Sequence, residues 1–250
     1  MLCLLAQGVV QLADLMTEMQ LLRDAALSGL ARDRLAILDV GAGRTSSFRV
    51  DGAQLVGFDS SSEELALNPH LDERVVGRIE EGSLPAGPFD VAVLWDVLEH
   101  VDAPHEALSK VSEVLAPDSA IVIAAPDPLS LKGVTTKITP LAFHRHVLRR
   151  VLPFVEREPF PTYLRFEMRP SAIRTWATRN GFDVVFFSLE EGLIQRRLRA
   201  RLRLHGWRWR LVRLLFRAVT LGRGSAAHTD YRMVLRRRPV VSPDSARNLL

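Results

Sequence analysis

Cysteine is nearly absent from this chain, and its absence limits the chemistry. Cys3 is the only cysteine among 250 residues, so the chain can form neither an internal disulfide nor a thiolate metal cluster. A chain without disulfides suits a reducing compartment. We therefore expect a cytoplasmic protein in which Cys3 is a buried, apolar thiol.

Long hydrophobic runs are missing as well. The apolar start, "MLCLLAQGVVQLADLMTEMQLL", is interrupted by Asp14 and Glu18 and followed by Arg23, well short of the roughly 20 apolar residues of a membrane span. It also lacks the basic leader of a secretory signal. We expect residues 1–34 to form an amphipathic helical segment that packs on the domain.

Acidic residues are missing from one long basic segment. Between Arg196 and Arg223 there are ten arginines and no aspartate or glutamate, although the net charge of the chain is only +4. The pattern predicts two helices within residues 193–221, broken at Gly206. On the second helix, apolar side chains share one face and arginines the other: Trp207, Leu211, Leu214, Leu215 and Ala218 against Arg210, Arg213 and Arg217.

Three interpretations of this basic segment stay open. A basic amphipathic helix with tryptophan suits an anionic membrane surface, which would put the protein at the inner face of a membrane. A helical pair that packs on the core with a solvated basic face suits the pattern equally, because arginine stems cover apolar surface. Nucleic acid fits less well, since the aromatic residues lie with the apolar ones and form no evident stacking platform.

What the chain does contain is a regular alternation of apolar runs and helical patterns. Apolar runs at 35–41, 54–60, 74–80, 90–96 and 119–126 predict strands, and residues 104–117 predict a helix that Pro117 ends. Such alternation indicates an α/β fold with a doubly wound, mostly parallel sheet.

We expect a single domain over 1–250, because the sequence is 47% hydrophobic and long enough for a substantial core. A ligand-binding core at 35–126 follows the N-terminal segment. A proline-punctuated cap at 127–169 precedes the C-terminal half of the sheet at 170–238, which has a helix at 170–182 and strands at 183–189 and 230–237. Residues 239–250 form a tail.

The stretch "LDVGAGRTSS" has the composition of a ligand-binding loop. Gly41 and Gly43 remove side chains where the backbone turns sharply after a strand, and Asp39 ends that strand with an acceptor. Asp59 ends the next strand, where a carboxylate accepts hydrogen bonds from two ribose hydroxyls. A tight turn without a ligand is the alternative for the loop alone.

Several cofactors suit such a loop, and a later stretch of the sequence indicates which of them the chain binds. The stretch "FDVAVLWDVLEHVDAPHEALSKVSEVLAPDSAIVIAAP" resembles the fourth-strand to fifth-strand region of class I S-adenosylmethionine-dependent methyltransferases. The stretch "AIRTWATRNGFDVVFF" is similar to a later helix and strand of that family. The resemblance implies S-adenosylmethionine as the cofactor and a seven-stranded sheet whose last strand, "DYRMVLRR", is antiparallel.

Carried over by position, the resemblance also implies a set of site residues. The methionine end of the cofactor would be lined by Asp39, Gly41, Ala42 and Gly43, and the ribose by Asp59 and Ser60. Glu80 and Glu81 would lie near the adenine. The floor of the methyl-transfer site would be formed by Trp95 and Asp96. The chain departs from the family where Thr45 replaces a third glycine and where "APDS" replaces a "KPGG" turn.

A hydroxyl acceptor needs a base to remove its proton, and histidine is the natural base near neutral pH. The candidates are His100, His105, His144 and His146, with Asp96 beside them. His100 follows the fourth predicted strand, and His144 and His146 lie in the predicted cap. If Asp96, Glu99 and His100 formed one helical turn, their side chains would share a face and could hold a divalent ion. A similar arrangement occurs in ubiquinone-biosynthesis O-methyltransferases, which this segment resembles. We nevertheless predict no metal.

The sequence thus predicts an S-adenosylmethionine-dependent methyltransferase that methylates oxygen on a small-molecule, glycan or lipid-linked acceptor. The alternatives are an RNA or DNA methyltransferase that uses the arginine-rich segment, and a non-catalytic S-adenosylmethionine-binding or scaffold protein. The acceptor and the oligomeric state are not predicted.

Overall fold

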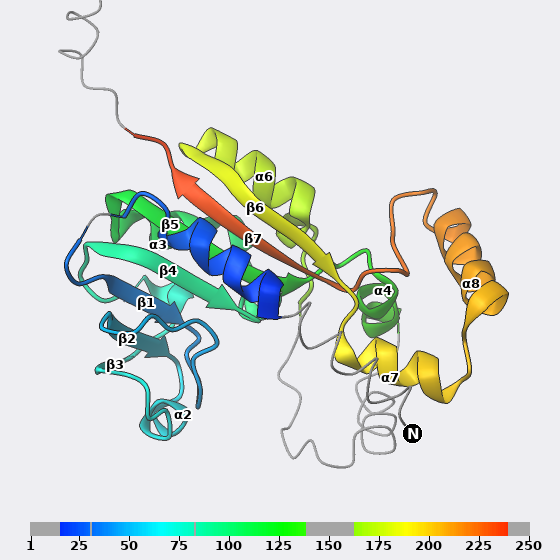
Figure 1. Ribbon diagram of the computed structural model, residues 1–250, viewed down its shortest axis with the longest axis horizontal. Coiled ribbons are helices and arrows are strands. Elements are labelled where there is room, and N and C mark those ends of the chain that lie inside the picture. Colours follow the sequence, from blue (N-terminus) through cyan, green and yellow to red (C-terminus); the bar gives the residue numbers. More distant parts are fainter. Residues whose placement is uncertain (1–15, 31, 83, 139–162, 240–250) are drawn as a thin grey trace, which may run out of the picture.

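Seven strands form one sheet in the computed structural model, which describes residues 16–30, 32–82, 84–138 and 163–239 (Figure 1). The strand order is β3-β2-β1-β4-β5-β7-β6. The strands are β1 (Ala36–Val40), β2 (Gln54–Asp59), β3 (Glu73–Val76), β4 (Phe89–Trp95), β5 (Leu115–Pro126), β6 (Phe182–Glu190) and β7 (Asp230–Arg237).

The pairing confirms the predicted mostly parallel sheet. All pairings among β1 to β5 are parallel, and β7 runs antiparallel between β5 and β6. The strand "DYRMVLRR" is therefore antiparallel, as the resemblance implied. The strand order reverses between β1 and β4, which is where doubly wound sheets bind their ligands.

Helices cover both faces of the sheet. A helix at 16–27 and the short α2 (Ser62–Ala66) place Leu22 and Leu65 in the core on one face. On the other face, α3 (Pro104–Glu113) and α6 (Pro170–Arg179) bury Leu108 and Ile173. Both of these helices begin at a proline, whose fixed φ suits the first helical position.

Two boundaries differ from the sequence prediction. The third strand is only Glu73–Val76, because the chain then turns into a 3₁₀ turn at Ile79–Glu81. The helix that we expected to reach Pro117 ends at Glu113, and β5 begins at Leu115. The pairing of β4 with β5 shifts register between Phe89 and Val91, so the extra residues around Pro117 are accommodated within the strand.

The predicted cap contains regular structure at its described ends. Helix α4 (Leu131–Ile138) follows β5, and a 3₁₀ turn at Phe166–Met168 precedes α6. Residues 139–162 lie outside the described residues.

The basic segment forms the two predicted helices, α7 (Leu193–Arg201) and α8 (Gly206–Val219). Gly206 starts α8 with a φ of +56°, in the left-handed region that favours glycine. The segment leaves after Glu190 and returns at Asp230, which are register partners on β6 and β7. In Figure 1, α8 stands beside this end of the sheet.

Among the described residues, no helix combines the length and the apolar character needed to cross a lipid bilayer.

Candidate active site

A cavity of ≈ 540 Å³ lies at the carboxyl ends of β1, β2 and β4, at the reversal of strand order. This volume is within the range of about 300–1,000 Å³ that is usual for small-molecule sites. Its lining comes from the loop after β1, the end of β2, the start of α2, the turn after β3 and the end of β4.

The loop after β1 turns back tightly on β2. The backbone N–H groups of Gly41 and Ala42 both donate to the carbonyl oxygen of Phe58, at 2.7 and 3.3 Å. Gly41 has a φ of +70°, and a Cβ there would lie 2.5 Å from a methyl group of Val97. A side chain here would therefore combine an unfavourable backbone conformation with a clash, and the absence of one lets Val97 pack directly against the loop.

Asn68 fixes the same loop from the end of α2. Its fully buried side chain donates from Nδ2 to the carbonyl oxygens of Ala42 and Gly43, at 3.3 and 3.2 Å, and to Oγ of Ser46 at 3.2 Å. Its Oδ1 accepts from the N–H of His70. The sequence does not single out this residue, because an "NP" pair by itself indicates only a turn.

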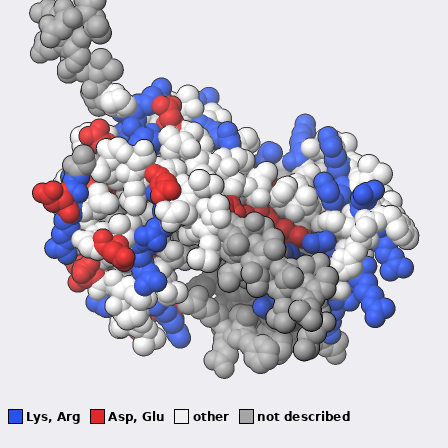
Figure 2. Space-filling view, viewed as in Figure 1, with Lys and Arg blue, Asp and Glu red and all other residues white. Residues whose placement is uncertain are grey.

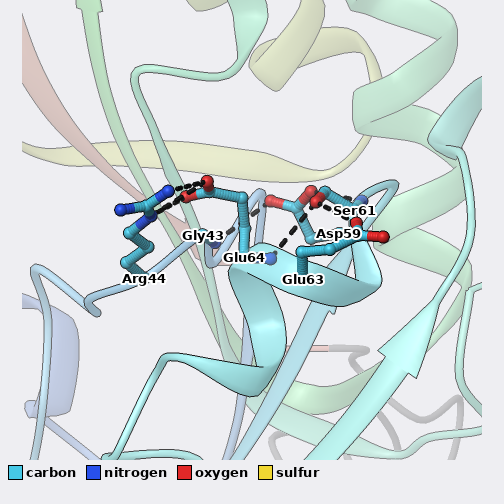
Figure 3. A network of polar contacts seen from close by, with 6 residues as sticks. All are labelled: Gly43, Arg44, Asp59, Ser61, Glu63 and Glu64. Atoms are coloured by element: carbon cyan, nitrogen blue, oxygen red, sulfur yellow. Dashed lines mark hydrogen bonds and ion pairs between the residues drawn. The ribbon is translucent and has the colours of Figure 1, made fainter. Parts of the chain in front are cut away.

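Asp59 joins this loop to the start of α2 (Figure 3). Its Oδ2 accepts from the N–H of Gly43 at 3.0 Å, and its Oδ1 accepts from the N–H of Ser61 at 2.9 Å. Each carboxylate oxygen can accept more than one hydrogen bond, and Asp59 lines the cavity. The remaining lone pairs can therefore accept from the two hydroxyls of a ribose.

An ion pair forms another part of the cavity wall. Nε of Arg44 donates to both carboxylate oxygens of Glu64, at 2.9 and 2.8 Å, and both residues line the cavity (Figure 3). Thr45 also lines the cavity and is not among the positive-φ residues of the described chain. The backbone at the place of the family's third glycine therefore does not require glycine.

Asp39 lies behind the loop and is 3% exposed. Burial raises the pKa of its carboxyl to about 7, against the hydrogen bond from Ser46, and the negative charge of Asp59 adds to the rise. Within the described part of the chain, its Oδ2 has no hydrogen-bond partner. Its neighbours Val40 and Gly41 line the cavity, so a donor on a bound ligand, such as the amino group of a methionine moiety, fits this oxygen.

The end of β4 forms the opposite part of the cavity, where Trp95, Asp96 and His100 all line it. Asp96 has a φ of +54°, a strained conformation for a residue other than glycine. The side chain of Asp96 is accessible from the cavity. Because the surrounding protein displaces water from its carboxyl, the pKa of that group is raised, and the positive charge of Lys132 opposes the rise.

Glu99 lies beneath this part of the cavity and is 7% exposed. Burial raises the pKa of its carboxyl to about 8, and repulsion from Asp96 adds to the rise. The backbone carbonyl of Glu99 accepts from the N–H of Tyr163 at 2.8 Å. Tyr163 follows the undescribed part of the cap and lines the cavity, a contribution that the sequence did not indicate.

The helical turn that would have united Asp96, Glu99 and His100 is not formed. Residues Leu98–His100 make a 3₁₀ turn, and the left-handed Asp96 lies outside it. In the described ranges, no group of three or more histidine, cysteine, aspartate or glutamate side chains is placed to hold a metal ion.

The structure brings most of the predicted cofactor residues to one cavity. Gly41, Ala42, Gly43, Asp59, Ser60, Glu80 and Trp95 line it, and Asp39 and Glu81 do not. Glu81 points to an exposed ion pair with Arg78 at 3.7 Å. Of the candidate bases, His100 lines the cavity and His105 lies on α3 away from it, while His144 and His146 lie outside the described residues.

The fold and the cavity define a class: a doubly wound α/β domain with a nucleotide-type site where the strand order reverses. Comparison with known proteins gives the family. Residues 13–186 match the model of a methyltransferase domain, and the chain belongs to this family. Its fold is that of a class I methyltransferase, and the cavity is consistent with S-adenosylmethionine, the cofactor that the resemblance implied.

The individual proteins that resemble this chain have low sequence identity to it. The mitochondrial ubiquinone biosynthesis O-methyltransferase of Schizosaccharomyces pombe is 28% identical over 128 residues, which is 46% of this chain and 45% of that protein. The chain thus spans less than half the length of this curated relative. A SAM-dependent methyltransferase from Archaeoglobus fulgidus has 19% identity and a TM-score of 0.50 over 88% of this chain and 94% of that one. The YcgJ protein of Bacillus subtilis has 14% identity and a TM-score of 0.53 over 88% and 99%.

Proposed function

We propose that this methyltransferase transfers the methyl group to a hydroxyl oxygen of a small-molecule, glycan or lipid-linked acceptor. The observation that carries the proposal is the position of His100 in the cavity wall beside Asp96, just beyond β4. The partial similarity to a ubiquinone biosynthesis O-methyltransferase also supports it.

The residues present fit the cofactor, because a carboxylate oxygen of Asp39 has no partner among the described residues and the cavity of ≈ 540 Å³ beside it provides the space. S-adenosylmethionine supplies an electrophilic methyl group on a sulfonium. Asp59 would hold the ribose, and the loop after β1 would hold the methionine end. The protein then has to align the acceptor oxygen with the methyl group and exclude water.

A neutral hydroxyl is a weak nucleophile, so the proton of the acceptor hydroxyl has to leave as the new bond forms. An imidazole nitrogen of His100 takes this proton in our proposal. Asp96 lies in the same wall, and the interaction of its carboxylate with the protonated imidazole is favourable.

The test is turnover with a panel of phenols, sugars and polyprenyl phenols, with the methyl position in the product located by NMR. We expect methyl ethers, and His100→Gln should slow turnover by about 10²–10⁴-fold. His105→Gln is the matched control, because His105 lies on α3 outside the cavity. Methylation at nitrogen or carbon, or unchanged turnover of His100→Gln, would overturn the proposal.

A further inference from the structure

Helix α8 has one side against the protein and two sides in solvent. Phe216 is its buried residue, and Trp209, Val212 and Thr220 are half-buried. These four residues follow one another at three- and four-residue steps, so they form one stripe of the helix. The described residues leave the rest of the helix uncovered.

One uncovered side of α8 is apolar. Trp207 is 69% exposed, Leu214 65% and Val219 82%, with Leu211 and Leu215 also exposed. At about 100° per residue these side chains lie on one side of the helix, which extends from opposite Phe216 round to Val219, with Arg208 at its margin. Large apolar patches on a soluble surface mark interaction sites. Among the described residues this face does not pack on the core, as the second interpretation of the sequence required, although the arginine face is solvated as that interpretation predicted.

The other uncovered side of α8 is basic. Arg210, Arg213 and Arg217 are all exposed and follow the helix along one edge of the apolar face. Within the described residues no carboxylate pairs with them, and the sequence from Arg196 to Arg223 contains none. Figure 2 shows lysine and arginine gathered over this end of the molecule, around uncharged surface.

We propose that α8 is a docking helix for an anionic lipid bilayer, independently of which acceptor the enzyme methylates. In that arrangement, the apolar face from Trp207 to Val219 enters the boundary of the acyl chains, and the flanking arginines meet the lipid phosphates. The charge matches such a surface, because every charged side chain of α8 is positive.

The same observations disfavour other occupants. A second copy of the chain would bring the arginines of two copies together across the apolar faces. A nucleic acid would satisfy the arginines but would leave the leucines of α8 in water, and Trp207 lies among those leucines rather than on a polar surface.

Helix α8 is fixed to the catalytic domain. Arg199 on α7 forms an ion pair with Glu191 at 2.9 Å, and its guanidinium lies 5.3 Å from the ring centroid of Trp209 on α8. Beyond α8, Ser225 pairs with Ser130, which precedes α4. The docking face is therefore held at the edge of the sheet that contains the carboxyl ends of β4 and β5, where the cavity also lies.

The test is co-sedimentation of the full chain with two kinds of vesicle, one of phosphatidylcholine alone and one of equal parts phosphatidylcholine and phosphatidylglycerol. We expect binding to the anionic vesicles that weakens with added salt, and little binding to the neutral ones. The emission of Trp207 should shift to the blue on binding, and Trp207→Phe should remove this shift.

Two groups of variants separate the contributions of the apolar and basic sides. Leu214→Gln with Leu215→Gln should weaken vesicle binding by about tenfold or more, because several apolar CH₂ groups no longer enter the bilayer. Leu67→Gln, at an exposed leucine on the C-cap of α2, is the control.

Neutralising Arg210, Arg213 and Arg217 to glutamine should weaken binding to the anionic vesicles by about a hundredfold. The matched control removes the same charge from exposed arginines elsewhere, Arg34, Arg49 and Arg179, and should have a much smaller effect.

Three outcomes would overturn the proposal. The first is equal or negligible sedimentation with both kinds of vesicle. The second is RNA binding that depends on the three arginines but not on Leu214 and Leu215, without vesicle binding. The third is a dimer in light scattering that the leucine variants convert to a monomer. None depends on methyl transfer, so failure here leaves the proposed reaction untouched.

Discussion

Two aspartates at the ends of neighbouring strands differ in the hydrogen bonds they make. Asp59 accepts hydrogen bonds on both carboxylate oxygens and lines the cavity, whereas Asp39 is buried with one oxygen unpartnered. Asp59 thus supports the loop and faces the ligand at the same time. Replacing Asp59 should therefore weaken cofactor binding in two ways, through the lost support of the loop and through the lost hydrogen bonds to the ligand.

We expect Asp59→Ala to weaken S-adenosylmethionine binding by about 1.5–3 kcal/mol, roughly 10- to 150-fold, because hydrogen bonds to a charged acceptor are lost. Calorimetric titration measures this. Asp72→Ala is the control, since Asp72 also accepts a backbone N–H, from Leu55 at 2.7 Å, but at the opposite end of β2. Equal affinities for the two variants would contradict the assignment.

At the scale of elements, the loop after β1 owes its shape to contacts with β2 and α2. The carbonyl of Phe58, the carboxylate of Asp59 and the amide of Asn68 hold successive parts of it. Asn68 does not line the cavity and is a positioning residue.

We expect Asn68→Ala to destabilise the fold by about 1–3 kcal/mol, because it leaves buried carbonyl groups without donors, and to weaken cofactor binding as well. Asn180→Ala is the matched control: Asn180 donates to the carbonyl of Trp176 at the end of α6, away from the cavity. Thermal unfolding and calorimetry should detect destabilisation in both variants and weaker cofactor binding in Asn68→Ala alone. An unchanged affinity in Asn68→Ala would remove Asn68 from the site.

The sequence predicted the elements whose signals are local. Buried strands such as "DVAVLWD" and the proline-started helices α3 and α6 were recognisable from periodicity and helix-start residues, and the strand ends brought Gly41, Asp59 and Trp95 to one edge. Asn68 was missed because the groups it holds are more than twenty residues away in the chain. The 3₁₀ turns at Ile79–Glu81 and Leu98–His100 also had no periodic signal, so the orientation of Glu81 and Glu99 could not be foreseen.

At the scale of the whole molecule, two buried carboxyl groups and one half-buried carboxyl group act on stability together. Burial raises the pKa of Asp39 to about 7, of Glu99 to about 8 and of Glu190 to about 7. A raised pKa means that the folded state binds the proton more tightly than the unfolded chain. This stabilisation is complete below the unfolded pKa and is lost as pH rises through the folded pKa.

We therefore expect the contribution of these groups to the free energy of unfolding to fall as pH rises from about 4 to about 8. Glu99→Gln should reduce the slope, with a gain over the unchanged protein on the order of 1–4 kcal/mol at pH 8. Thermal unfolding at several pH values measures this, and Glu113→Gln, at an exposed position on α3, is the control. Parallel curves for the unchanged protein and Glu99→Gln would show that Glu99 is not buried as described.

The register of β6 and β7 has a consequence for how this molecule can vary. Glu190 and Asp230 are paired across neighbouring antiparallel strands, a separation that a two-residue turn can bridge. Residues 191–229 therefore leave and re-enter the sheet at adjacent points. The entropy of closing such a loop grows by only about 0.6 kcal/mol for each doubling of its length. Evolution or an engineer can thus lengthen, shorten or exchange this segment while the sheet and the loops around the cavity keep their geometry.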